Sequence, residues 1–288
     1  MKQTARALLT LSLCLATGLA ADAAFAQETS APRTALKVCQ DPSNLPFSNT
    51  RGEGIENRIA EVFGKAMGLP VTYYSFPQRL AFIRNTLRYK LPGEDFPCDV
   101  VLGVPAGFDQ VAVTKPYYRS TYALVFAQGK GLDGVKSSQD FLQLPPAQLA
   151  KLRIGLHDRS PASAWLSKHG LVDQGVPYNT MNADPAHYPG EIIENDLVAG
   201  KIDVAIVWGP VAGFFAKRVK TVALTVVPMR SEPGVKFDFE MAMGVRYGER
   251  EWKQQIEGLI ESQQAAIKSI LLEFGVPLVD ASYSAGPR

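Results

Sequence analysis

Two nearly continuous apolar runs constrain the fold of this chain more than any other sequence feature. They are Cys98–Val104 and Ile202–Trp208, and each is as long as one β-strand. Strands that read as almost unbroken apolar runs are typical of parallel sheets, in which both faces are covered. Parallel strands are joined by long crossovers that are usually helices, so the two runs predict an α/β fold.

The patterns that precede the first run agree with this prediction. Leu36–Cys39 and Val71–Phe76 are predicted as strands, and Gln78–Tyr89 is predicted as a helix. Apolar residues recur at helical spacing over residues 55–67, and Gly68 stands where a C-terminal helix cap belongs. With the first run, this order makes a βαβαβ unit.

A second α/β set follows and predicts a second lobe. Its expected strands and helices are Arg153–Leu156, Ala162–His169, Glu191–Ala199, Ile202–Trp208, Phe239–Val245 and the mostly helical Gly248–Phe274. Extended segments near Tyr122–Phe126 and Glu240–Val245 are expected to cross between the lobes. We therefore predict a bilobal molecule, with lobe 1 at 34–125 and 245–288 and lobe 2 at 126–244.

The expected ligand site lies where strands of both lobes end. In open α/β sheets, ligands bind beyond the carboxyl ends of the strands. The loops at these ends are 41–48, 103–108, 157–161 and 208–210. The two lobes would present them to one cleft.

The first 26 residues have the layout of a secretory signal peptide. Lys2 and Arg6 give a basic start, Ala7–Ala21 is almost wholly apolar, and Ala24–Ala26 is a small-x-small cleavage pattern. The apolar run of about 15 residues is shorter than the ~20 residues that a membrane-spanning helix needs. We therefore predict export to the periplasm after cleavage.

A lipid anchor on Cys14 is the alternative reading of this segment. Bulky Leu13 precedes the cysteine, and a good cleavage pattern follows later, so the anchor is disfavoured. No later stretch is apolar over 18 residues. The mature chain is therefore expected to have no membrane span.

Charge and composition exclude several classes of function. The 30 Lys and Arg residues nearly balance the 28 Asp and Glu residues, which gives a net charge of +2. This excludes a protein built mainly to neutralise nucleic-acid phosphates or to bind anionic lipid. Three histidines, without an Asp-rich calcium loop or a His/Cys cluster, are a poor supply of metal ligands. We expect neither a metal nor a cofactor of its own.

Several short motifs follow one another in a specific order over residues 35–246. They are Cys39–Asn49, Gly52–Ala60, Pro77–Arg79, Arg84–Leu87, Cys98–Pro105, Pro116–Tyr122, Arg153–His157 and Ile202–Pro210. In this order they resemble the periplasmic solute-binding proteins of the amino-acid type. More closely, they resemble the MxaJ and XoxJ family, which is associated with the quinoprotein alcohol dehydrogenases of methanol oxidation. The resemblance implies a type II periplasmic-binding-protein-like fold.

Two charged ligand contacts that the resemblance implies are missing from this sequence. Amino-acid binders of this kind hold the ligand carboxylate with an Arg shortly after the third strand, but Gly103–Gln110 contains no basic residue. They hold the ligand ammonium with an acid after the lobe 2 strand, where this chain has Gly209. Burying a zwitterion without these partners would cost several kcal/mol. Free amino acids are therefore poor ligand candidates.

Three classes of function remain open on this sequence. The resemblance implies a non-catalytic accessory protein that assists the assembly or activation of a periplasmic PQQ-dependent methanol or alcohol dehydrogenase. That enzyme, or its cytochrome c, would be the partner. The quinone and the metal would be bound by the partner and not by this chain. The second class is a transporter's receptor for a small solute that lacks the amino-acid zwitterion. An enzyme on the same fold is disfavoured, because the four cleft-facing loops contain no Glu to serve as a general acid.

Ten residues are the candidates for a ligand cleft or a partner surface. They are Asn44, Phe47, Gln78, Arg79, Pro105, Tyr117, Tyr118, Arg119, His157 and Trp208. Asn44, with Phe47 and Trp208, would line an apolar pocket, although the two aromatic residues would equally suit packing at the hinge. Tyr117–Arg119 would form a partner-binding hot spot or, again, hinge packing.

The remaining candidates also have two readings each. Gln78 and Arg79, together with Arg84, would form a docking patch or an ordinary solvated helix face. His157–Ser160 opens a helix, so its free amides would bind an anion or simply be capped. Catalysis by these contiguous residues is disfavoured, and we predict no catalytic residue.

A disulfide between Cys39 and Cys98 is left open by the sequence. Exported cysteines can form bridges, and the expected 2-1-3 strand order makes their strands neighbours. However, if Leu36 is level with Asp99, then Cys39 lies about three residues, or roughly 10 Å, further along. Bridged cysteines have Cα atoms within about 7 Å.

Overall fold

The computed structural model describes residues 32–78, 81–180, 184 and 187–283. Residues Thr34–Arg288 form one compact unit. The predicted signal peptide at 1–26 and candidate Arg79 lie outside the described residues. In the part of the chain that is described, no helix is long and apolar enough to cross a membrane.

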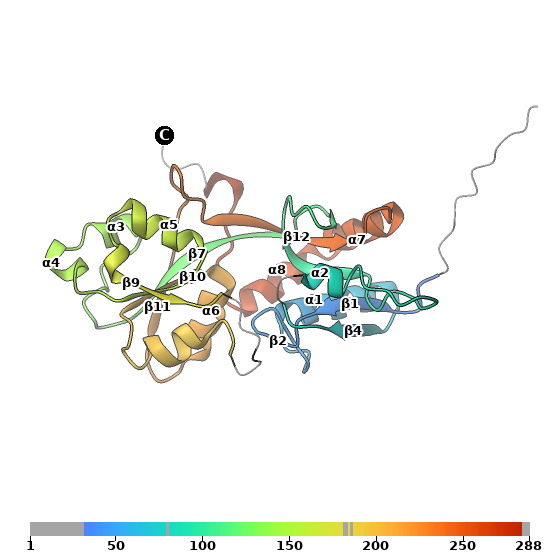
Figure 1. The fold of residues 1–288 in the computed structure, drawn as a ribbon, viewed down its shortest axis with the longest axis horizontal. Helices are drawn as coiled ribbons and strands as arrows, with labels where there is room; N and C mark the ends of the chain where they lie inside the picture. Colours follow the sequence, from blue (N-terminus) through green and yellow to red (C-terminus); the bar gives the residue numbers. More distant parts are fainter. Residues whose placement is uncertain (1–31, 79–80, 181–183, 185–186, 284–288) are drawn as a thin grey trace, which may run out of the picture. The chain divides into compact units, whose positions relative to one another are not determined.

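One sheet of ten strands carries the fold (Figure 1). Eight strands form its path, in the order β4 (Val71–Ser75), β1 (Leu36–Gln40), β5 (Val100–Pro105), β12 (Asp238–Val245), β7 (Tyr118–Ala127), β10 (Val204–Trp208), β8 (Ile154–His157) and β9 (Gly175–Tyr178). Off this path, β6 (Ala112–Val113) pairs with β12 and β11 (Leu224–Pro228) pairs with β7. A separate small ribbon pairs β2 (Ser43–Asn44) with β3 (Ser48–Asn49).

The first half of the sheet, β4-β1-β5, has the expected 2-1-3 order. Strand β1 pairs in parallel with both β4 and β5. The second half, β10-β8-β9, is parallel as well. The two apolar runs that predicted parallel strands form β5 and β10, so the α/β prediction is confirmed.

Strands β7 and β12 connect the two halves and run side by side between them (Figure 1). Residues 118–121 of β7 pair with residues 238–241 of β12, and beyond this point β7 pairs with β10 and β11. Strand β12 continues in the other direction, along β5 and β6. The crossovers expected near 122–126 and 240–245 are therefore these two strands. The exact lobe boundaries stay a prediction.

The helices lie between and after the strands as the sequence indicated, with several changes of length. Their bounds are α1 (Ile55–Met67), α2 (Phe82–Asn85), α3 (Ser138–Leu142), α4 (Pro146–Leu149), α5 (Pro161–Lys168), α6 (Gly209–Arg218), α7 (Arg250–Ser262) and α8 (Gln264–Glu273). Short 3₁₀ turns are η1 (Val172–Gln174) and η3 (Ala281–Tyr283), and η2 (Ile192–Leu197) is a π-helix.

The helix predicted over Gln78–Tyr89 is wrong in length, because regular helix in the described part of this segment is limited to α2. The next residue, Thr86, leaves the helical region at φ −126° and ψ −89°. Its buried hydroxyl donates instead to the Phe82 carbonyl oxygen, at 2.7 Å. This side chain-to-backbone bond competes with continued helix and begins an irregular connection to β5.

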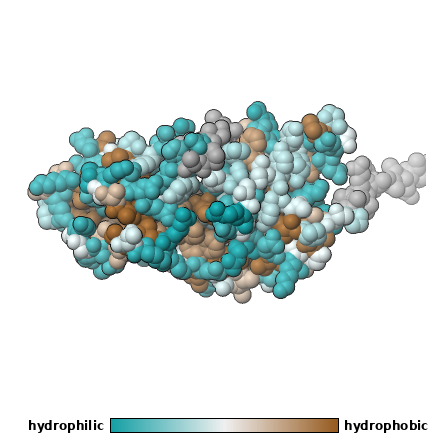
Figure 2. All heavy atoms as spheres, turned by 90° about the horizontal axis from the view of Figure 1, so that it is seen from below, coloured by the Kyte–Doolittle hydropathy of each residue, from teal (hydrophilic) through white to brown (hydrophobic). Residues whose placement is uncertain are grey.

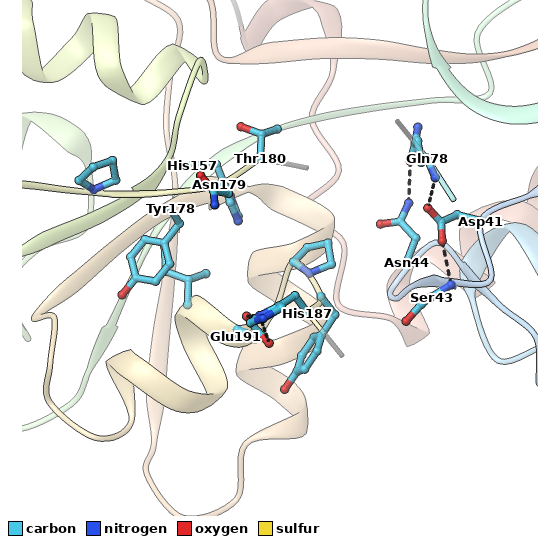
Figure 3. A pocket seen from close by; sticks show the side chains of 14 residues that line it. Asp41, Ser43, Asn44, Gln78, His157, Tyr178, Asn179, Thr180, His187 and Glu191 are labelled. Carbon is cyan, nitrogen blue, oxygen red and sulfur yellow. Dashed lines mark hydrogen bonds and ion pairs between the residues drawn. The ribbon is translucent and has the colours of Figure 1, made fainter. Parts of the chain in front are cut away.

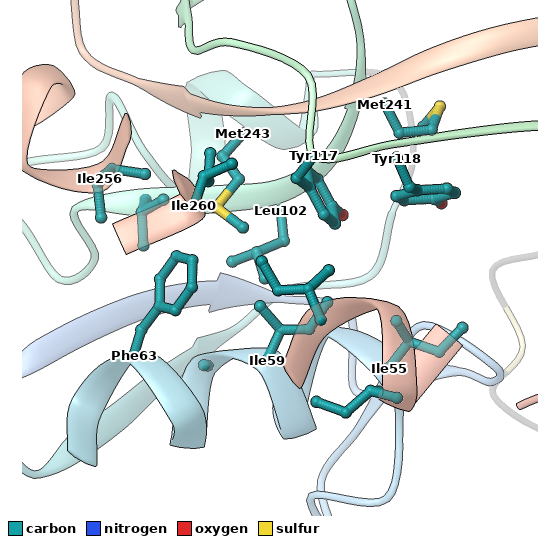
Figure 4. Close-up of a cluster of buried hydrophobic side chains, with 14 of the residues drawn as sticks. Ile55, Ile59, Phe63, Leu102, Tyr117, Tyr118, Met241, Met243, Ile256 and Ile260 are labelled. Atoms are coloured by element: carbon teal, nitrogen blue, oxygen red, sulfur yellow. The ribbon is translucent and has the colours of Figure 1, made fainter. Parts of the chain in front are cut away.

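Helix α1 shows how sequence spacing produces the core. Ile55, Ile59 and Phe63 are almost fully buried, in one cluster with residues of the sheet, α7 and α8 (Figure 4). These positions lie on one helical stripe, so a single face is removed from water. Gly68 ends the helix in the left-handed region, at φ 67°, as expected for a C-terminal cap.

The structure contains the Cys39–Cys98 disulfide, with the two Cα atoms 5.2 Å apart. The distance argument against this bridge is therefore wrong. Cys39 does pair with Val101 in the ladder, three positions after Cys98. Cys98, however, precedes β5, the chain bends at Asp99, and the Asp99 N–H donates to the Lys37 carbonyl oxygen. Because the chain bends before the strand begins, extrapolating an extended strand overestimates the separation.

Candidate functional site

A cavity of about 540 Å³ lies between the loop after β1 and the segments after β8 and β9 (Figure 3). It is lined by Asp41, Ser43, Asn44, Gln78, His157, Pro177, Tyr178, Asn179, Thr180, His187, Tyr188, Pro189, Glu191 and Ile192. The cavity therefore brings together three of the predicted candidates, Asn44, Gln78 and His157. Its size is in the range of pockets for small molecules.

The first wall is held by the Asp41 carboxylate. This group accepts the Ser43 N–H at 2.8 Å and the Gln78 N–H at 2.5 Å. Asn44 Nδ2 donates to Gln78 Oε1 at 2.8 Å, so two segments distant in sequence are tied together (Figure 3). These bonds fix the loop and aim amide groups at the cavity.

Buried Asn57 on α1 supports this loop from behind. Its Oδ1 accepts the N–H groups of Asn49 and Gly54, each at 3.1 Å, and its Nδ2 donates to Gln40 Oε1 at 2.8 Å. A buried amide with its donor and acceptor both used stabilises a defined loop conformation. The sequence reasoning did not single out Asn57, which looked like an ordinary helix residue.

The second wall is polar and mostly self-bonded. The Tyr178 hydroxyl donates to Asp196 at 2.7 Å, and the Tyr188 hydroxyl donates to Glu194 at 2.7 Å. The side chain of Glu191 lies 2.9 Å from His187 Nδ1. The hydrogen bond to Glu191 raises the pKa of His187, and the carboxylate charge adds to this effect. Tyr178 ends β9, whereas Glu194 and Asp196 belong to the π-helix η2, a local geometry frequent at functional sites.

Of the three predicted candidates that line the cavity, His157 is the one with a titratable side chain. Burial lowers the pKa of its imidazole, and the nearby Asp158 charge opposes this only in part. The side chain is therefore a neutral donor and acceptor near pH 7. With the amides and tyrosines, it makes a cavity suited to polar molecules rather than to apolar ones.

The other candidates lie away from this cavity. Tyr117 and Tyr118 are buried in the core of α1, β5 and α7, with rings 4.9 Å apart (Figure 4). Arg119 forms ion pairs with Asp238 at 2.6 Å and with Glu240 at 3.1 Å, across the β7–β12 pair. These placements correspond to packing at the crossover strands.

The remaining aromatic candidates also pack between elements. Trp208 lies 5.5 Å from the Tyr122 ring and 5.9 Å from the Phe239 ring, between centroids. Phe47 packs against the hydrophobic cluster of η2 and α6. Pro105 is exposed at the end of β5, outside the cavity lining.

The structure identifies Glu56, in the first turn of α1, as a group that the sequence reasoning missed. Burial raises the pKa of its carboxyl to about 8, and the Asp41 charge contributes in the same direction. Gly103, at φ 69°, leaves room for this carboxyl, since a Cβ there would overlap Glu56 Oε1. Its position in the first turn of α1, shortly after the cleft-facing loop 41–48, was the signal in the sequence that could have indicated it.

The buried hydroxyl of Tyr117 lies near Glu56. Its buried oxygen makes no well-formed hydrogen bond with any described residue. Burial raises the pKa of Tyr117 well above its usual value, Tyr118 and Glu56 add to this, and the backbone of Gly103 opposes it. Neither Glu56 nor Tyr117 lines the cavity, so the two groups form a separate feature of the first half of the sheet.

Among the residues that the structure describes, no three His, Cys, Asp or Glu side chains gather in a way that could hold a metal ion.

Comparison with known proteins identifies several similar chains. No protein-family model matches the chain. The crystal structure of the periplasmic binding protein XoxJ from Methylobacterium extorquens AM1 is 34% identical, covers 85% of this chain and 100% of its own, and superposes with a TM-score of 0.68. MxaJ from Methlophaga aminisulfidivorans MPT is 26% identical, with the same coverage and a TM-score of 0.70. MoxJ of Paracoccus denitrificans is 28% identical over 276 residues, 91% of this chain and 96% of that protein.

Proposed function

The chain belongs to the MxaJ and XoxJ family of periplasmic binding proteins, and on this premise we propose that it is an accessory protein of a PQQ-dependent methanol or alcohol dehydrogenase. It would act in the periplasm, after removal of the predicted signal peptide. It would bind the dehydrogenase and assist its assembly or activation without catalysing a reaction itself.

The observation that carries this proposal is the backbone packing around Gly209. In amino-acid binders that the sequence resembles, an acid at this place holds the ligand ammonium. Here a Cβ at Gly209 would overlap the Thr121 carbonyl oxygen and lie 2.6 Å from Pro277 Cγ and 2.7 Å from Ser120 Oγ. No acidic side chain could be accommodated there without moving the backbone, which supports the loss of amino-acid binding.

The arginine that would hold the carboxylate of an amino-acid ligand is also missing. The loop after β5 begins at Pro105 and carries no basic residue through Gln110. An amino-acid carboxylate would therefore lack a bidentate arginine partner, and a buried unpaired charge costs several kcal/mol. A protein that keeps the binding-protein fold but loses both ligand charges is suited to recognising a protein.

The proposed mechanism is recognition of one state of the dehydrogenase. An exposed surface of this chain would bind the immature or cofactor-poor enzyme more tightly than the mature one. Such a difference in affinity is what shifts the partner's population between states. The quinone and its metal would belong to the partner.

The test is direct binding of the mature protein to a purified quinoprotein methanol dehydrogenase, prepared with and without its quinone and metal. We expect tighter binding to the cofactor-free form. Equal affinity for both forms would contradict the assembly role and indicate a permanent accessory subunit. Failure to bind either form at tens of micromolar would overturn the proposal for that dehydrogenase.

The polar cavity supports a second candidate function, that of a receptor for a small uncharged solute. Its amides, neutral His157 and hydroxyl groups could fix such a molecule. A thermal-shift screen of polar metabolites tests this function. A hit that is lost in Asn44→Ala but kept in Asn85→Ala, which lies on α2 outside the cavity lining, would favour it over the accessory role.

A further inference from the structure

A basic segment, residues 84–91, forms an exposed surface beside the first half of the sheet. Arg84, Arg88 and Lys90 are exposed, and no ion pair joins them to any other residue that the structure describes. Tyr89 and Leu91 are 38% and 44% exposed, and are two of the five large hydrophobic residues exposed in the described part of the chain. The segment therefore combines unpaired cations with exposed apolar surface.

The backbone of the basic segment directs these side chains outward together. Thr86 and Leu87 are buried, as is Ile83 just before the segment, whereas Arg84 and Arg88 are exposed. Arg84 lies in α2, and Arg88 follows the end of that helix at Thr86. Both guanidinium groups are therefore accessible at the surface.

Arg246 anchors the irregular segment between α2 and β5 to the core. Its Nη1 donates to the carbonyl oxygens of Leu87 at 3.1 Å and Cys98 at 2.6 Å, and its Nη2 lies 2.6 Å from Asp99 Oδ1. Its guanidinium also lies 4.0 Å from the centroid of the Phe96 ring. The Cys39–Cys98 disulfide then joins the end of the connection to β1.

Two ring contacts hold individual side chains of the basic segment. The Tyr89 ring is stacked on Tyr74 of β4, with centroids 6.2 Å apart and planes 9° from parallel. Lys90 Nζ lies 5.1 Å from the Phe96 ring centroid. Side chains that are already ordered lose less entropy when a partner binds, which favours affinity.

The acids of this connection are separate from the cations in sequence. Glu94 and Asp95 are exposed too; Glu94 ends the turn in which its N–H donates to the Leu91 carbonyl oxygen, and Asp95 follows it. Residues 84–91 themselves carry three cations and no acid. The positive charge of the basic segment is therefore complementary to an acidic surface on another protein.

We propose that the basic segment is the surface by which this chain docks on an acidic patch of its partner protein. The inference rests on the proposed function, which makes that partner the dehydrogenase. Arg and Tyr are the residue types most enriched at binding hot spots, and the cations would steer the encounter. The face drawn in Figure 2 is mostly hydrophilic, with groups of hydrophobic residues scattered over it.

Charge reversal tests the docking surface against a matched control. The test variant is Arg84→Glu with Arg88→Glu, and the control is Lys130→Glu with Lys151→Glu, which makes the same charge change at exposed positions on the other half of the molecule. We expect the test variant to bind the purified dehydrogenase at least tenfold more weakly at low salt, and the control to stay within threefold of wild type. The wild-type affinity should also fall with salt more steeply than that of the test variant.

The outcomes separate the docking surface from the function on which it depends. If wild type binds and the test variant binds equally well, the docking surface is wrong and the accessory function stands. If both variants lose affinity alike, long-range charge and not this surface determines binding, and the proposal is overturned. If wild type does not bind, both proposals fail. Tyr89→Ala, which leaves charge unchanged, is expected to weaken binding at high salt as well, and equal far-ultraviolet circular dichroism checks the fold of each variant.

Discussion

The surroundings of Glu56 differ from those that a glutamate side chain normally prefers. Its carboxyl lies at the N-terminus of α1, against Gly103 and near Asp41, and burial raises its pKa to about 8. Near neutral pH this group therefore keeps its proton in the folded protein. In the unfolded chain its pKa returns to about 4.5, so folding binds a proton between these two values.

Glu56→Gln is expected to remove part of the pH dependence of stability. Because the folded state binds more protons than the unfolded state between about pH 4.5 and pH 8, this group makes the free energy of unfolding fall as pH rises. Urea unfolding of wild type and variant at pH 5, 7 and 8 measures the difference. The free energy of unfolding of the variant, relative to that of wild type, should rise by at least about 1.4 kcal/mol from pH 5 to pH 8. This is the equivalent of one pKa unit.

The control for this prediction is Glu61→Gln, an exposed carboxylate on the same helix. Its stability difference from wild type should stay constant over the same pH range. A Glu56→Gln variant that also showed a constant difference would mean that the carboxyl is not protonated in the folded protein.

At the scale of elements, α6 and the end of α8 approach each other more closely than side chains normally allow. A Cβ on Gly213 of α6 would overlap the Gly275 carbonyl oxygen, which follows α8. Beside this contact the rings of Phe214 and Phe274 are stacked, with centroids 5.4 Å apart. Lys217 Nζ donates to the Glu273 carbonyl oxygen at 2.7 Å, so it provides a hydrogen-bond partner for a free carbonyl group at the C-terminus of α8.

Gly213→Ala and Gly258→Ala should therefore change stability in opposite directions. Alanine in a helix interior is intrinsically better than glycine by about 1 kcal/mol, and the Cβ at Gly258 of α7 would meet nothing within 4 Å. Gly258→Ala is expected to stabilise by up to that amount. Gly213→Ala forces the two backbones apart and is expected to destabilise by about 1–3 kcal/mol. Thermal and urea unfolding measure both, and a stabilised Gly213→Ala would contradict the close approach.

The same scale shows what the sequence could and could not predict. Helix α1 and the 2-1-3 strand order follow from spacing and apolar runs, because burial of whole faces dominates their free energy. The connection after α2 depends on single contacts made by distant Arg246, which no local pattern reveals. The disulfide could not be decided for a related reason: it depends on a bend immediately before β5, where strand geometry no longer applies.

The cavity was predictable only in part. Asn44 and His157 follow the carboxyl ends of strands, so the rule for ligand sites in α/β sheets indicates them. Tyr178 lines the opposite side because it ends β9, a strand that the sequence did not predict, and Tyr188 and Glu191 line it because of the loop before η2. A π-helix has no sequence signature comparable to the helical stripe of α1, so these residues could not be placed in advance.

For the molecule as a whole, the C-terminal segment links the two halves of the sheet a third time. After α8 it runs along β7, where the Val279 N–H donates to the Arg119 carbonyl oxygen and Ser120 Oγ donates to the Pro277 carbonyl oxygen. It then reaches the end of β11, where the Tyr283 hydroxyl donates to the Pro228 carbonyl oxygen at 3.0 Å. Binding proteins that close around a solute must bend between their halves, and each added link opposes such bending.

The angle between the two halves is therefore expected to be fixed, and Tyr283 is the residue through which this can be tested. Arg230 lies 4.4 Å from the centroid of the Tyr283 ring, so Tyr283→Ala removes a cation–π contact and a hydrogen bond, worth about 1–2 kcal/mol together. Spin labels at Lys65→Cys and Lys151→Cys, exposed positions on opposite halves, report the distance between them. We expect one narrow distribution in wild type and a broader one in Tyr283→Ala. Tyr247→Ala, which removes a hydrogen bond to Asp109 within the first half, should leave the distribution narrow. A broad wild-type distribution would show that the halves move freely, and it would favour the solute receptor over an accessory protein that presents a rigid surface.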